Sequence, residues 1–139
     1  MSVDHVVFVR DDRLPTLEQW QAALARADSG IVLEKIDDLR AHTGYLPASH
    51  RGHDSGFEWY YGTIDEWFDG DPPEGLGDRQ HVATFVTHSD MREFVCGMVA
   101  GAVLAQVSIG MVYDEDSDEL IDAHAALEIA RGTEKKIQS

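Results

Sequence analysis

The side chains best suited to chemistry lie in the stretch SHRGHDSG, where His50, His53 and Asp54 form the pattern H-x-x-H-D. Imidazole and carboxylate groups are zinc ligands, but a zinc site requires three or four of them converging on one point. His42, His81 or His88 could supply the remaining ligands only if the fold brought them together. A small metal-binding protein or enzyme that uses the His50–His53 loop is our alternative hypothesis, and two histidines facing water are the simpler explanation.

A second group, His88, Ser89 and Asp90, contains the three residue types of a hydrolase triad. Triad members meet in space and are not chain neighbours, and Ser or Asp before an apolar run is explained by helix capping. The paired carboxylates Asp65 and Glu66 are too common an arrangement to indicate acid–base catalysis. The chain contains no G-x-S-x-G, P-loop or dinucleotide-binding glycine pattern. We therefore predict no catalytic residue and no cofactor, and we expect the protein not to be an enzyme.

A third group, Asp114, Asp116 and Asp118, gives the first half of a calcium-binding loop. An EF-hand loop also needs glycine at its sixth position and glutamate at its twelfth. Glu119 and Ala125 occupy these positions. The pattern therefore predicts a solvated acidic turn before a helix, whose positive N-terminus favours nearby acids, and we predict no metal ligands.

The chain is organised around a very apolar helix that lies between two strands. Asp90 and Glu93 are three apart at the helix start, which is the D-x-x-E form of a capping box. Residues 94–105 carry no charged or strongly polar side chain, so the helix must be buried on several sides. Gly97 and Gly101 share one helix face. Because a mid-helix glycine costs about 1 kcal/mol relative to alanine, we predict that these glycines let a strand or helix approach the backbone closely.

The flanking segments complete this unit. Residues 81–87 are apolar on both faces of their alternation, which favours a central strand, and residues 111–113 form a short strand after Gly110. The apolar helix is shorter than the roughly 20 residues that span a membrane, so we predict a core helix and no membrane association. Cys96, the single cysteine, excludes an intramolecular disulfide and is predicted to be a buried, inert thiol.

Hydrophobic periodicity predicts the remaining elements in chain order. Strands are predicted at residues 6–10, 31–36 and 57–63, and helices at 17–27, 64–68 and 119–131. Loops are predicted at 37–55 and 69–79, with a short strand around residues 45–46 as the alternative within the first. A capping box of Thr16 and Gln19 begins the first helix. Gly132 is expected to end the last helix before a frayed tail.

This order of elements predicts an α+β fold over a single domain, residues 1–139. We expect a two-layer sandwich whose sheet is mixed but mostly antiparallel, with the helices on one face. The central strand–helix–strand is expected to form a right-handed parallel unit. A split βαβ arrangement, as in ferredoxin-like folds, is the most natural topology.

Charge is the strongest compositional signal. The 139 residues include 26 acids against 11 Lys plus Arg, a formal net charge of −15. Nucleic-acid binding needs a basic surface and is therefore not expected. An excess of negative charge attracts basic partners and also serves solubility alone. The N-terminus leads straight into a strand pattern, so we expect no signal peptide and a cytoplasmic location.

Acids and aromatic residues are interleaved in residues 54–78, which contain eight acids and no Lys or Arg. Phe57, Trp59 and Tyr61 alternate along a strand and are expected to fill the core. The outward residues have the composition of a hot-spot surface for a basic protein partner. The predicted partner-binding residues are Glu58, Tyr60, Asp65, Glu66, Trp67, Asp69 and Asp71.

The segment GYLPASHRGHDSGFEWYYG, with the later apolar helix and the ending GMVYD, resembles small uncharacterised bacterial proteins of immunity-protein type. Some of these are encoded beside toxin or secreted-effector genes. The resemblance implies a non-catalytic protein that occludes a basic toxin or effector domain. A homodimer that buries the exposed aromatic side chains is the further alternative.

Overall fold

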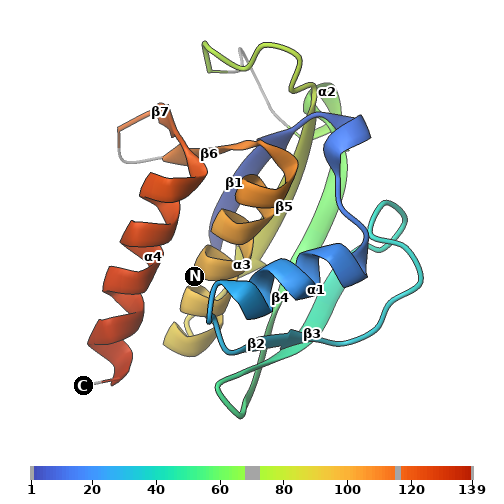
Figure 1. Cartoon of the computed structure of the whole chain (residues 1–139). Coiled ribbons are helices and arrows are strands. Elements are labelled where there is room, and N and C mark those ends of the chain that lie inside the picture. The colour runs from blue at the N-terminus through green and yellow to red at the C-terminus, as the bar shows by residue number, and fades with distance from the viewer. Residues whose placement is uncertain (1, 68–72, 115–116, 139) are drawn as a thin grey trace.

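The computed structural model describes residues 2–67, 73–114 and 117–138, and Figure 1 shows the whole chain. In chain order its elements are β1 (Val3–Val9), a 3-10 turn (Asp11–Arg13), α1 (Leu17–Arg26), β2 (Ile31–Leu33), β3 (Gly44–His50), β4 (His53–Thr63), α2 (Ile64–Trp67), β5 (His81–Thr87), α3 (Met91–Ser108), β6 (Met111–Asp114), β7 (Glu119–Ile121) and α4 (Ala123–Gln138).

The strands form one seven-stranded sheet in the order β2-β3-β4-β5-β1-β6-β7, and every described strand pair is antiparallel. The α+β fold is confirmed. We expected β5 and β6 to pair directly as a parallel unit. They do not, because β1 lies between them and runs antiparallel to both. The unit β5-α3-β6 is therefore a split βαβ. The order β4-β5-β1-β6 is the ferredoxin-like one, with β2, β3 and β7 added at the edges.

Helix α3 lies across one face of the sheet, with α1 and α4 on the same side (Figure 1). The odd-numbered residues of β1, β4 and β5 point at it, including buried Val7, Phe57 and Phe85. Trp20 of α1 packs among the inward aromatic rings and donates its indole N–H to the carbonyl of Ala100, 3.1 Å away. Among the described residues, α3 alone is long and apolar enough to cross a membrane, and 61% of it is buried inside the fold.

The two glycines of α3 face the sheet, as predicted. A Cβ atom at Gly97 would lie 2.8 Å from Cγ2 of Thr87 on β5, which is closer than real Cβ contacts. A Cβ atom at Gly101 would lie 3.5 Å from Cγ2 of Val7 on β1. The missing side chains therefore let α3 lie directly on the two central strands. At the helix start, Asp90 caps the amides of Arg92 and Glu93.

A smaller apolar cluster lies on the opposite face of the sheet. Val6, Phe8 and Val82 are buried there against Ile64 of α2 and Leu76 of the following loop. Both faces of β1 and β5 are thus buried along this part of their length, which confirms the prediction of a central strand at residues 81–87.

The prediction of a loop at residues 37–55 is wrong, because most of its second half forms the β3–β4 hairpin; the alternative of a short strand around residues 45–46 lies within β3. Two residues, Arg51 and Gly52, make the turn with φ angles of 50° and 84°. A two-residue hairpin turn of this kind needs positive φ at both positions and normally carries Asn-Gly or Asp-Gly. Arginine at the first position, and Pro47 within the strand, concealed the hairpin.

The C-terminal prediction also needs correction. Residues Glu119–Ile121 form β7 against β6 rather than the start of a helix. Helix α4 begins after Asp122, whose carboxylate accepts the amide of Ala125 at 2.8 Å. The helix continues through Gly132, and the expected frayed tail is helical with Glu134 buried.

The glycine contacts lead to a paired stability prediction. Gly97→Ala should lower the free energy of unfolding by about 1–3 kcal/mol, because the new methyl group overpacks against β5. Gly132→Ala is the matched control in α4, where nothing lies within 4 Å of the new Cβ. It should raise stability by about 0.5–1 kcal/mol through helix propensity. Urea denaturation of both variants measures the difference, and a harmless Gly97→Ala would refute the close packing.

Candidate functional site

The predicted partner-binding residues of β4 lie on the sheet face opposite α1, α3 and α4. One row of paired residues crosses four strands on that face, and it reads Tyr45, Glu58, Val86 and Asp4. Neighbouring strands are about 4.8 Å apart, so the row is about 14 Å long. With the exposed Val32 of β2 and with Tyr60, these residues define the open face.

Glu58 lies at the centre of the open face and has two side-chain partners. Tyr60 Oη donates to Glu58 Oε1 at 2.5 Å, and His88 Nε2 lies 2.6 Å from Glu58 Oε2. The hydrogen bond from Tyr60 and then that from His88 lower the pKa of the Glu58 carboxyl group. Glu58 is therefore ionised at neutral pH, and Tyr60 is held in place beside it.

The other predicted partner-binding residues follow β4 in α2 and the next loop. Asp65 and Glu66 are exposed on α2, and Glu66 Oε1 accepts the hydroxyl group of Thr63 at 3.0 Å. The side chain of Trp67, together with Asp69 and Asp71, lies outside the described part of the chain. The structure thus places Glu58, Tyr60 and the two α2 acids along one strand and the helical turn that follows it.

The inward aromatic residues of β4 behave largely as predicted. Phe57 and Trp59 are 1% and 0% exposed and belong to the main core. Tyr61 is half-buried: its ring stacks on Trp59 and on His81, and its hydroxyl group donates to Asp11 Oδ1 at 2.7 Å. Burial raises the pKa of Tyr61, so its hydroxyl group stays protonated and serves as a donor.

His50 is buried in the interior at the hairpin end, contrary to the simpler expectation of two histidines facing water. Its Nε2 lies 2.5 Å from Glu134 Oε2, and its Nδ1 lies 3.3 Å from a guanidinium nitrogen of Arg92. Arg51 also donates to Glu134, at 3.0 Å. The guanidinium of Arg92 donates to Nδ1, and the carboxylate of Glu134 accepts from Nε2. These partners suit a neutral imidazole that carries its proton on Nε2.

The charges of this cluster follow from its surroundings. Burial lowers the pKa of His50 and outweighs the opposing effect of Glu134. Burial alone would raise the pKa of Glu134, but the hydrogen bonds from Arg51 and His50 overcome it and lower that pKa. The result is a carboxylate paired with Arg51 beside a neutral imidazole. It ties α4 to the β3–β4 hairpin across 84 residues of sequence.

This arrangement does not favour a joint metal site of His50 and His53. Both ring nitrogens of His50 contact protein side chains, and His53 is exposed beyond the turn. Within the described ranges, no group of three or more His, Cys, Asp and Glu side chains is placed to hold a metal ion. His88 and Asp90 also have separate roles, at Glu58 and at the start of α3.

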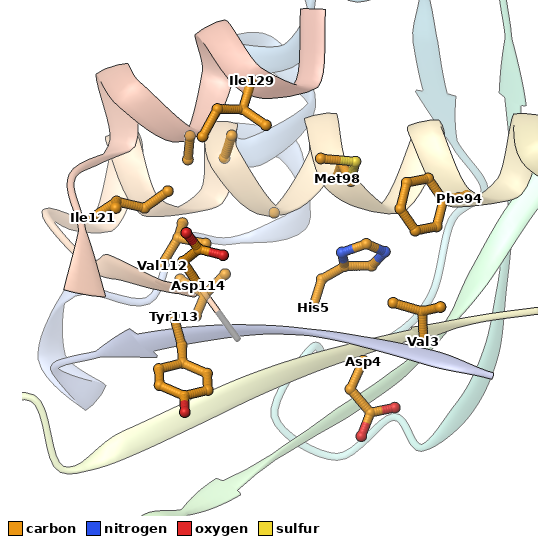
Figure 2. A pocket seen from close by; sticks show the side chains of 14 residues that line it. Val3, Asp4, His5, Phe94, Met98, Val112, Tyr113, Asp114, Ile121 and Ile129 are labelled. Carbon is orange, nitrogen blue, oxygen red and sulfur yellow. The ribbon is translucent and has the colours of Figure 1, made fainter. Parts of the chain in front are cut away.

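Sequence reasoning missed a pocket that lies under α3 and α4 on the helical face of the sheet. Its volume is about 270 Å³, and its walls come from β1, α3, α4, β6 and β7. Figure 2 shows the His5 ring rising from β1 towards Met98 and Phe94 of α3, with Ile121 and Ile129 farther along. The alternation of His5 with Val7 on an inward-facing strand was the only sequence signal for this site.

The imidazole ring of His5 is part of the pocket wall. Its Nε2 lies 3.3 Å from Oγ1 of Thr87, and the ring meets Phe94 edge-on with centroids 5.0 Å apart. Burial lowers the pKa of His5 to about 4, so the imidazole is neutral at physiological pH. Cys96, also in α3, is buried as predicted, and burial raises the pKa of its thiol to about 12.

No protein-family model, no curated protein and no solved structure matches this chain.

The buried His5 predicts a pH dependence of stability. Between pH 6.5 and about 4 the unfolded chain protonates His5 and the folded chain does not, so the free energy of unfolding falls as the pH is lowered through this window. His5→Phe should flatten that slope relative to the wild type. Urea denaturation at a series of pH values measures it, with His124→Gln, at a side chain 84% exposed, as the control. Equal slopes in wild type and His5→Phe would contradict the assignment.

Proposed function

We propose that this protein is a non-catalytic binding protein of immunity type, which occludes a basic toxin or effector domain through the open face and the acids of α2. The observation that carries the proposal is the ionised Glu58, held between Tyr60 and His88 in the middle of a sheet face that α1, α3 and α4 leave uncovered.

The distribution of ion pairs supports a basic partner. Arginine ion pairs lie away from these acids: Arg10 pairs with Asp12 and Asp78, Arg40 with Asp11, and Arg51 with Glu134. Among the described residues, Glu58 and the two α2 acids have no Lys or Arg partner in the structure. These carboxylates are therefore available to cations of a second protein, which they would attract over about a Debye length of 8–10 Å.

The aromatic residues of the open face supply the apolar part of such an interface. Tyr45 is 48% exposed, yet its hydroxyl group donates to the carbonyl of Ser55 at 2.9 Å and contacts Glu93 at 3.1 Å. Tyr60 is anchored to Glu58 in the same way. Tyrosines that are already ordered lose little conformational entropy on binding, which is why they are frequent at interface hot spots.

The first test uses the product of the gene adjacent to that of this protein, purified as a catalytically inactive variant, in titration calorimetry. We expect a complex whose affinity decreases at least tenfold between 50 and roughly 300 mM salt, because the acids attract a basic surface. Absence of binding by every adjacent gene product would overturn the immunity assignment.

Charge reversal then locates the surface. The double variant Asp65→Lys/Glu66→Lys and the single variant Glu58→Lys should each weaken the complex at least tenfold, which corresponds to about 1.4 kcal/mol. Glu18→Lys, at an exposed acid of α1 on the other face, is the matched control and should leave the affinity within about twofold. Equal losses in all three variants would show that net charge, not this surface, determines binding.

Light scattering of the protein alone tests the homodimer alternative. If the open face pairs with a second copy, the wild type is dimeric and Glu58→Lys is monomeric. That result would replace the proposed partner with a second copy of this chain.

A further inference from the structure

The pocket at His5 is separate from the open face and has a different chemistry. Its walls are largely hydrocarbon, from side chains such as Val7, Phe94, Met98, Val112 and Ile121. The walls come from both layers of the fold, with the sheet below and α3 and α4 above. Apolar pockets with a few converging polar groups are the usual form of small-molecule sites.

The polar group of the pocket is the imidazole of His5. One ring nitrogen, Nε2, is occupied by Thr87. The other, Nδ1, has no hydrogen-bond partner among the described residues and is not fully buried, so it is accessible to a bound molecule. A neutral imidazole offers one donor and one acceptor nitrogen. Nδ1 can therefore serve a single hydrogen bond to a bound molecule.

The charge around the pocket excludes one class of ligand. Asp114 of β6 contributes to its lining, whereas the Asp4 side chain points away from His5 (Figure 2), and the whole chain carries a net charge of −15. Within the lining of this pocket there is no lysine or arginine. An anion would have to leave water for an apolar site without a counter-charge, which is strongly unfavourable.

The volume limits the size of the ligand. A dry apolar cavity of about 150 Å³ holds one benzene ring, and this pocket is about 270 Å³. By that comparison it has room for a bicyclic aromatic group or an alkyl chain of roughly eight carbons. Ile129, which is 50% exposed on α4, lies at the rim.

We propose that this pocket binds a small uncharged organic molecule, with an alkyl or aryl body against the walls and one hydroxyl group at His5 Nδ1. A hydroxyl group both donates and accepts, so it suits either tautomer of His5. The site lies on the helical face of the sheet, so its occupancy does not depend on the open face binding a protein.

The test is a titration followed by methyl NMR spectra, with three probes of equal chain length: 1-octanol, octanoate and octylammonium. We expect 1-octanol to shift the methyl signals of Met98, Ile121 and Ile129 saturably, while those of Val32 on β2 stay in place. Octanoate should bind at least tenfold more weakly than 1-octanol, because its carboxylate has no counter-charge in the pocket. Octanoate or octylammonium binding more tightly than 1-octanol would overturn the assigned ligand class.

A blocking variant confirms the location. Ile129→Trp enlarges a half-exposed side chain at the rim, so it should fold normally and weaken 1-octanol binding at least tenfold. Met91→Trp, at a side chain 52% exposed at the start of α3 and outside the pocket lining, is the matched control and should bind as the wild type does. Equal binding in both variants would refute the site.

The role of His5 is tested by the pair 2-naphthol and naphthalene. His5→Phe should weaken 2-naphthol binding several-fold and leave naphthalene binding unchanged, because only the former has a hydroxyl group for Nδ1. Circular dichroism and a Met98 methyl signal in its folded position verify that the variant is folded. Equal weakening of both probes would assign His5 a shaping role and overturn the hydrogen bond.

Discussion

The close contact of α3 with the two central strands is the constraint on which the rest of the structure depends. Gly97 and Gly101 carry no side chain, so the helix backbone packs directly on side chains of β1 and β5, such as those of Val7 and Thr87. Because the helix lies so close, Trp20 and the inward aromatic rings can cover the rest of the same face. The helices α1 and α4 therefore pack on that face as well, and part of the opposite face stays open (Figure 1).

Charged groups complete what apolar packing begins. Glu134 joins the C-terminal helix to the hairpin through His50 and Arg51, and burying such a carboxylate is favourable only with partners on several sides. This contact holds one end of α4 against the hairpin, while α3 supports its length. Beneath the other part of α4 the side chains do not fill the space above β1 and β6, which leaves the pocket at His5.

The two candidate sites use opposite faces of the same strands. Along β1, His5 faces the helices and the pocket, while Asp4 belongs to the row that crosses the open face. Along β4, Trp59 fills the core, while Glu58 and Tyr60 face outward. Alternation along a strand thus places a largely apolar pocket and an acidic surface on opposite sides of one sheet.

Periodicity, capping and composition by themselves determined the α+β class, the buried glycine-containing helix, the central strand and the outward acids, because each depends on neighbours within a few residues. The β3–β4 hairpin, the strand β7 and the helical C-terminus were not determined in this way. Arg51 accepts positive φ only because the paired strands hold it, and Glu134 is buried only because His50 lies 84 residues away in sequence. The pocket likewise arises from five elements that meet only in the tertiary structure, where burial lowers the pKa of His5.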